Sequence, residues 1–220
     1  MEFNLEDYKN YFNSTLRGTG RDGINDLITW LESTDFYTAP ASSKFHGAYE
    51  GGLLTHSLNV LKCLQEKRNN GTWQKTFSDN NTPDESLVIV ALLHDVCKCN
   101  FYKPTWRNQK TYDADKVAAA QKWQVKSDNG GSFIWETVQG YTVDEELPFG
   151  HGSKSVYLIC KHIKLTDEEA VAIRFHMGAF EGQNIWLQLG QAFEKYPLAL
   201  ALHEADAEAT HIFEAQGEQK

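Results

Sequence analysis

The sequence predicts an all-α fold with one small β-hairpin insertion, and three observations support this prediction. Apolar residues recur at helical spacing over most of the 220 residues. Two segments, Thr82-Pro-Asp-Glu85 and Thr166-Asp-Glu-Glu169, have the pattern of capping boxes that begin helices. One region instead alternates aromatic or β-branched residues around Asp128-Asn-Gly-Gly131, which is typical of a β-hairpin turn.

Two helices are expected at the start of the chain. Residues 4–17 and 23–33 carry apolar side chains at helical spacing, and Asn4 and Asp22 are suitable N-cap residues. Residues 34–49 lack this periodicity, so we expect an irregular connection there.

The central helices follow. Residues 50–67 form a clearly amphipathic pattern, and a loop rich in Asn, Thr, Ser and Asp is expected over 69–82. Pro83 stands at the first helical position, where a missing N–H costs nothing, and it begins the helix that carries His94.

The helical pattern lapses after Lys98. We expect an insertion of about 50 residues over about 100–150, in which residues 122–126 and 133–138 form the strands of the hairpin. Helical spacing resumes at residues 152–162.

The last two helices have clear starting signals. The second capping box begins a helix that reaches His176. Pro197 begins a final long helix that extends to about Ala215.

Length and composition indicate a single globular domain. The chain is 41% hydrophobic, so we expect one domain over residues 1–220, with N-terminal helices over 4–34 and a core over about 45–215. No apolar stretch approaches the roughly 20 residues of a membrane span, and the N-terminus lacks the features of a signal peptide. The four cysteines show no paired spacing, so reduced thiols and a cytoplasmic location are expected.

The charge is acidic but unevenly distributed. A net charge of −9 argues against general binding to long nucleic acid. Residues 98–126, however, contain seven basic and two acidic residues, hence +5, which leaves −14 for the rest of the chain. Aromatic residues are interleaved with these cations, a pattern that suits a nucleotide. A solvated surface loop with anchoring aromatics is the alternative interpretation.

The adjacent pair His94-Asp95 is the most informative feature of the chain. It ends the segment 87–93, which is apolar on every side and is therefore expected to lie in the core. An imidazole and a carboxylate are costly to bury there without a partner, and a metal ion bound by nitrogen and oxygen would compensate that cost.

Four other residues are candidates for the same site: His56, His151, His176 and Asp206. His56, His176 and Asp206 fall on or beside the apolar side of their predicted helices, and His151 stands where a helix begins. Each one alone could be a satisfied core or cap residue. One shared metal site explains all of them together with His94-Asp95 more simply than separate core contacts do.

In this order the residues resemble the HD-domain superfamily of metal-dependent phosphohydrolases, and the motifs are closest to the HD domain of the 3'-5' exoribonuclease branch. The segment from His46 to His56 is similar to that branch, and His94-Asp-Val-Cys-Lys98 matches a His-Asp-x-x-Lys motif in which Gly is commoner than Cys. Three further segments stand at the expected places: Phe149-Gly-His151, Arg174-Phe-His176 and His203-Glu-Ala-Asp206. The resemblance covers about residues 45–210.

The resemblance implies an HD-type helical bundle with two metal ions. One ion would be held by His56, His94, Asp95 and Asp206, and the other by His151 and His176, with Asp95 bridging. This nitrogen-rich set suits Mn²⁺, Fe, Co²⁺ or Ni²⁺ better than Mg²⁺, and Zn²⁺ is also less expected.

The implied activity is hydrolysis of a phosphate ester by a water that the two metals activate. Asp95 and Lys98 are the expected catalytic residues, with Lys98 neutralising phosphoryl charge; a lysine that faces a helix dipole is the alternative. His203 is expected to support the site from behind the ligands. The expected substrate-binding residues are His46, Lys98, Tyr102, Arg107, Lys110 and Lys116.

The acidic charge, and the lack of a nucleic-acid module like that of the exoribonucleases, favour a nucleotide or a short oligonucleotide over long RNA as the substrate. Two alternatives from other classes stay open. One is a di-iron HD-fold oxygenase, which iron content and oxygen consumption would identify. The other is a non-catalytic nucleotide-sensing module, whose melting temperature would shift with ligand although no product forms.

Overall fold

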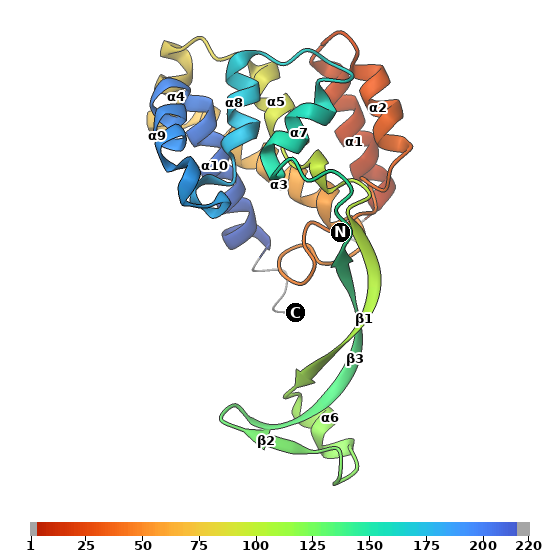
Figure 1. The fold of residues 1–220 in the computed structure, drawn as a ribbon. Coiled ribbons are helices and arrows are strands. Elements are labelled where there is room, and N and C mark those ends of the chain that lie inside the picture. The colour runs from red at the N-terminus through yellow and green to blue at the C-terminus, as the bar shows by residue number, and fades with distance from the viewer. Residues whose placement is uncertain (1–3, 215–220) are drawn as a thin grey trace.

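The computed structural model describes residues 4–214 and shows a helical body from which a long β arm projects (Figure 1). The helices of the body are α1 (Leu5–Gly18), α2 (Ile24–Glu32), α3 (Gly52–Asn69), α4 (Gly71–Asp79), α5 (Asp84–Leu93), α7 (His151–Ile159), α8 (Asp167–Phe175), α9 (Trp186–Lys195) and α10 (Pro197–Glu208). The arm consists of β1 (Tyr102–Thr111), α6 (Ala114–Ala119), β2 (Lys126–Asp128) and β3 (Gly131–Val143). The predicted helical class with a small β insertion is confirmed at this level. Within the described range, no helix combines the length and the apolar character needed to cross a bilayer.

Helix α5 lies in the centre of the body, as its uniformly apolar sequence predicts. Leu87 and the run from Ile89 to Leu93 are all buried, and α5 packs against α3 and α8. A helix that is apolar on every side has no polar face to expose to water, so it is stable where other elements cover it on all sides. The end of α5 therefore carries His94 and Asp95 into the interior.

The two N-terminal helices begin in different ways. Asn4 caps α1 by accepting a hydrogen bond from the N–H of Glu6 at 3.1 Å, as predicted. The cap of α2 is Gly23 and not the predicted Asp22. Gly23 has a φ of +82°, and a Cβ there would lie 2.1 Å from the carbonyl oxygen of His162, so only glycine fits.

The segment expected to be a polar loop over residues 69–82 contains α4. Phe77 of α4 is fully buried and its ring stacks with that of Trp73 at 5.5 Å, so core burial and one aromatic contact stabilise a helix that the polar composition does not reveal. The first predicted capping box is also wrong, because Pro83 is the N-cap of α5 and Thr82 makes no capping hydrogen bond. The second box is confirmed, since Thr166 and Glu169 cap α8 reciprocally.

The arm is a three-stranded antiparallel sheet with the strand order β1-β3-β2. The turn at residues 128–131 is confirmed, but the strand expected over 122–126 is short and begins only at Lys126. The main partner of β3 is β1, which pairs with it from Tyr102↔Val143 to Thr111↔Ile134. The sequence analysis missed β1 because it contains a proline and many polar residues, which a strand tolerates where it is not packed inside the body.

The C-terminal part contains elements that the sequence did not predict. Short 3₁₀ segments at Gly178–Glu181 and Gln183–Ile185 precede α9, which was also missed. Pro197 begins α10 as predicted. The chain then continues as a π-helix over Ala209–Glu214, and the predicted end at Ala215 lies outside the described residues.

Candidate metal centre

Five elements bring the six predicted ligands together at one place in the body. His56 lies on α3, His94 and Asp95 lie at the end of α5, and the others come from α7, α8 and α10. Three of the four imidazoles (His56, His94 and His176) are 1% exposed or less. Close groups of three that could hold an ion are His56-His94-Asp95, His94-His176-Asp206, Asp95-Cys97-His151 and His46-His56-Glu214.

Asp95 is the centre of this cluster, and its two carboxylate oxygens face different imidazoles. Oδ2 lies 3.5 Å from Nε2 of His94 and 3.8 Å from Nε2 of His56. Oδ1 lies 2.6 Å from Nε2 of His151 and 3.5 Å from Nε2 of His176. The carboxylate therefore stands between two separate pairs of nitrogen donors.

Asp206 completes the first group. Its Oδ1 lies 3.2 Å from Nε2 of His56. The side chain comes from the last turn of α10, and it also lies close to His94 and His176. Carboxylate oxygens of both Asp95 and Asp206 are thus near the pair His56 and His94.

Backbone carbonyls fix the orientation of two ligand rings. Nδ1 of His94 donates to the carbonyl of Ala91 at 2.9 Å, and Nδ1 of His176 donates to the carbonyl of Ile173 at 2.7 Å. Nε2 of each ring then carries the lone pair that a metal ion could use, and it lies 3.5 Å from a carboxylate oxygen of Asp95. Nε2 of His176 is buried and has no hydrogen-bond partner among the described residues. A buried nitrogen of this kind, beside other nitrogen and oxygen donors, fits a transition-metal ion.

The electrostatics of the cluster are dominated by paired opposite charges. Burial alone would lower the pKa of His56, but hydrogen bonds to Asp206 and Glu214 outweigh burial and raise it to about 10. Burial alone would raise the pKa of Asp95, but Lys98 and His94 hold it well below its ordinary range. Burial lowers the pKa of His151. The carboxylates are therefore ionised, as metal ligands must be.

Sequence reasoning missed Glu214, which orients His56. Oε1 of Glu214 accepts a hydrogen bond from Asn59 at 3.0 Å and lies 3.0 Å from Nδ1 of His56. Regular α-helical geometry would turn Glu214 about 80° away from Asp206, eight residues earlier. The wider turns of the π-helix over Ala209–Glu214 bring it back to the face of the ligands.

The segment after Asp95 contributes Cys97 and Lys98. Nζ of Lys98 lies 2.6 Å from Oδ2 of Asp95, and the side chain is almost completely buried. Sγ of Cys97 lies 3.5 Å from both ring nitrogens of His151, while burial raises the pKa of its thiol. Cys97 therefore packs beside His151 as a neutral thiol.

A cavity of about 790 Å³ opens onto the cluster. Among the predicted substrate-binding and supporting residues, those that line it are His46, Lys98, Tyr102 and His203. Lining residues that the sequence analysis did not single out include Lys44, Phe45, Met177, Phe180 and His211. Asp95 and Asp206 are its only acidic lining residues in the described chain. The cavity therefore combines apolar walls with cationic and imidazole groups near the cluster.

The other three predicted substrate-binding residues do not line this cavity. Arg107 and Lys110 lie on β1, and Lys116 lies on α6, within the arm. Lys110 pairs with Asp128, and Lys116 pairs with Glu136 at 2.7 Å. These two cations of the predicted basic segment are thus paired within the arm.

His203 is attached to the cluster through the backbone. Its Nδ1 donates to the carbonyl of His176 at 2.7 Å, and its ring stacks on Phe193 at 5.5 Å. A Cβ at Gly178 would lie 2.5 Å from the His203 ring, so that glycine leaves room for the imidazole. The ring is held at the wall of the cavity beside the ligands.

Comparison with known proteins returned no matching family model, no matching curated protein and no matching solved structure.

Proposed function

We propose that this chain is a metal-dependent phosphohydrolase of the HD superfamily that holds two divalent transition-metal ions. The observation that carries the proposal is the position of Asp95, whose two oxygens face two separate sets of nitrogen donors. A single carboxylate between two donor sets is the arrangement that a bridging ligand requires.

The chain's own donors divide into two sets around Asp95. His56, His94 and Asp206 would hold one ion, and His151 and His176 the other. Two such ions, when bound, supply a water nucleophile near neutral pH and positive charge against the phosphoryl oxygens. The predominance of nitrogen donors favours Mn²⁺, Fe²⁺, Co²⁺ or Ni²⁺ over Mg²⁺.

Lys98 supplies a fixed cation at the reacting group. Its ammonium contacts Asp95 and also lines the cavity, so it can meet a phosphoryl oxygen beside the cluster. A buried, pre-positioned charge stabilises the charge that develops in phosphoryl transfer. His203 keeps Nε2 available for the leaving group, because Nδ1 is committed to the carbonyl of His176.

The cavity supports a nucleotide-sized substrate. Its volume of about 790 Å³ far exceeds what a free phosphate needs and lies within the usual range for small-ligand sites. Phe45, Met177 and Phe180 offer apolar surface for a base, while Lys44 and Lys98 offer positive charge for phosphate. We therefore propose a nucleotide or a short oligonucleotide as the substrate.

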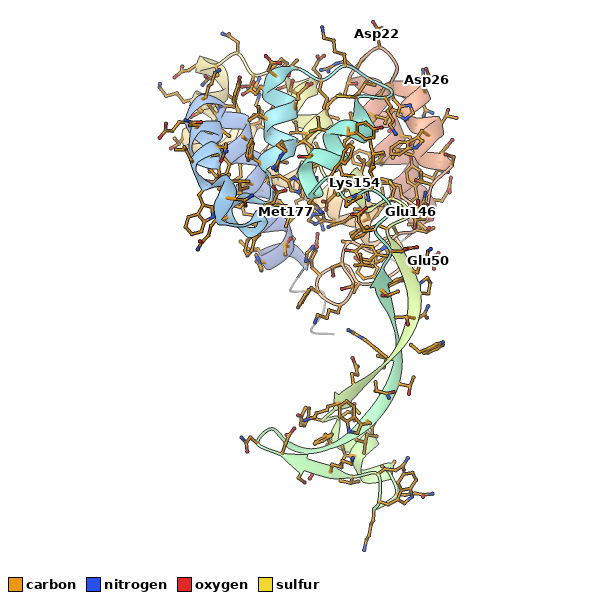
Figure 2. The ribbon with its side chains drawn as sticks, in the orientation of Figure 1. Asp22, Asp26, Glu50, Glu146, Lys154 and Met177 are labelled. Atoms are coloured by element: carbon orange, nitrogen blue, oxygen red, sulfur yellow. The ribbon has the colours of Figure 1, made fainter. Side chains whose placement is uncertain are left out.

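The test is hydrolysis by protein loaded with Mn²⁺, measured on a generic phosphodiester and on a panel of nucleotides. Asp95→Ala is expected to lose metal binding and turnover together. Asp26→Ala is the matched control, because Asp26 is exposed on α2 at the upper edge of the body, whereas the cavity residue Met177 lies in its lower part (Figure 2). Full turnover by Asp95→Ala, or no turnover by fully loaded wild-type protein, would overturn the proposal.

A further inference from the structure

The arm has two faces of different chemistry. In an antiparallel pair, directly opposite residues point to the same side, and alternate residues point to opposite sides. The register of β1 and β3 therefore defines two sets. The aromatic face comprises Tyr102, Pro104, Trp106, Asn108, Lys110, Trp135, Thr137, Gln139, Tyr141 and Val143. The polar face comprises Lys103, Thr105, Arg107, Gln109, Thr111, Ile134, Glu136, Val138, Gly140 and Thr142.

The two faces also differ in charge. Lys103, Arg107 and Glu136 lie on the polar face, whereas Lys110, opposite Trp135, is the one charged residue that β1 and β3 place on the aromatic face. Lys110, at the outer end of the aromatic face, is paired with Asp128 and lies over the ring of Phe133. An antiparallel sheet with several charged residues on one face and a single, paired cation on the other has the pattern of a sheet that packs on one side only.

The aromatic face is nevertheless open. Trp106 is 72% exposed and Trp135 is 51% exposed. The short helix α6 packs on β3 and pairs with it through Glu136, which lies on the polar face. Within residues 4–214, β1 packs extensively only against β3, and the arm projects from the body (Figure 1). The aromatic face, whose composition is typical of a packed surface, is thus the face of the arm that stays exposed to solvent.

We propose that the aromatic face is a dimerisation surface that packs against the same face of a second copy of this chain. A two-fold interface brings the same patch of both copies together, and this face adds little net charge to it, because its one cation on β1 is paired with Asp128 of the same arm. Single-stranded nucleic acid needs free cations beside the stacking rings, and the one cation that β1 places on this face is already paired.

Stability also favours a permanent partner. A free two-stranded ribbon is marginally stable in water, and β1 and β3 pair over about 34 Å without a helix beneath the aromatic face. Aromatic side chains each bury about 150–250 Å² when covered, so the rings of two copies would bury on the order of 1,000 Å². That area reaches the lower bound of a stable protein interface. A second copy is a partner that is always present, whereas a substrate is not.

The experiment is the molecular mass of the full chain in solution, determined by sedimentation at several concentrations. Wild-type protein is expected at twice 25.0 kDa, hence 50.0 kDa. Two matched variants test the face: Gln139→Lys on the aromatic face and Gln109→Lys on the polar face, both at exposed positions of the paired strands. Gln139→Lys adds an unpaired charge from each copy to the proposed interface and is expected to weaken association at least tenfold. Gln109→Lys is expected to leave it unchanged.

The possible outcomes can be distinguished from one another, and none of the measurements depends on enzymatic activity. A monomer at every concentration, or equal weakening by both lysine variants, would overturn the proposal. Far-UV circular dichroism of each variant checks that the arm is folded. As a second measurement, quenching of tryptophan fluorescence by acrylamide should rise in Gln139→Lys, because Trp106 opposite residue 139 becomes exposed. If the protein is a monomer and binds a short oligonucleotide through the arm, the aromatic face is a nucleic-acid-binding surface and not a dimer interface.

Discussion

Oε1 of Glu214 lies 3.0 Å from Nδ1 of His56, and the other nitrogen of the same ring lies 3.2 Å from Asp206. The imidazole is therefore held between two carboxylates, one behind it and one on the side of the cluster. A carboxylate behind a metal-binding histidine fixes its tautomer and raises its strength as a ligand.

Glu214→Gln is expected to weaken metal binding by about 10–100-fold without preventing it, because the ring keeps its position but loses the negative charge behind it. Competition with a chelator of known affinity measures the change. Glu208→Gln is the control: Glu208 lies on the adjacent turn but pairs with Lys67 at 2.6 Å. Equal affinities of Glu214→Gln and wild-type protein would show that Glu214 has no effect on the site.

Lys98→Met is expected to lower kcat by about 10²–10³-fold under the proposed function, since one fixed cation at the phosphoryl group is lost. The number of bound metal ions should remain two, because Lys98 supplies no lone pair while protonated. Steady-state kinetics and elemental analysis of the same sample separate these effects. Lys103→Met is the matched control, because Lys103 pairs with Asp144 on the arm. A loss of metal equal to the loss of turnover would instead make Lys98 a structural residue.

The stability of the fold is expected to fall in acid through Glu169. Its buried carboxylate accepts hydrogen bonds from Arg21 at 2.8 and 3.0 Å and from Ser86 at 2.7 Å, and Glu85 also contacts Arg21. Burial alone would raise the pKa of Glu169, but these bonds outweigh burial and hold it below 4.5. The folded state thus binds fewer protons than the unfolded state. This stabilisation is complete above the unfolded pKa and is lost as the pH falls through the folded pKa.

Glu169→Gln tests this dependence. It should destabilise the protein by about 1–3 kcal/mol at neutral pH, because a buried charged hydrogen bond is lost. Thermal unfolding measured between about pH 7 and pH 3 should show the variant and wild-type curves converging in acid. Glu32→Gln, at an exposed position on α2, is the control. A constant difference at all pH values would contradict the assignment to Glu169.

The parts of the fold that the sequence predicted are those that neighbouring residues in the chain determine. The capping box at Thr166 and the proline at 197 act within one turn, so their effect can be read from neighbouring residues. The apolar run before His94 likewise predicts burial without knowledge of its partners. The cluster itself followed from histidines and carboxylates on or beside apolar helix faces.

The parts that escaped prediction depend on distant contacts. Helix α4 forms because Phe77 finds a place in the core, which its polar neighbours do not reveal. Strand β1 is fixed by pairing with residues about 30 positions away. Glu214 reaches His56 only because the last turns form a π-helix, and no local pattern in the sequence indicated that change of period.

Gly152 controls the distance between two ligand-bearing helices. It follows His151 at the start of α7, and a Cβ there would lie 2.3 Å from the carbonyl oxygen of Arg174 and 2.6 Å from that of Ile173. Both carbonyls belong to α8, just before His176. Because neither backbone group can rotate away, an alanine must push α7 from α8 and draw His151 away from Asp95.

Gly152→Ala is therefore expected to destabilise the fold by about 1–3 kcal/mol and to lower the number of bound ions from two towards one. Denaturant unfolding and metal analysis measure the two effects. Gly190→Ala in α9 is the control, because no atom lies within 4 Å of its added Cβ and alanine is the better helix former. Two bound ions in a Gly152→Ala protein of normal stability would show that the close approach of α7 and α8 does not set the geometry of the site.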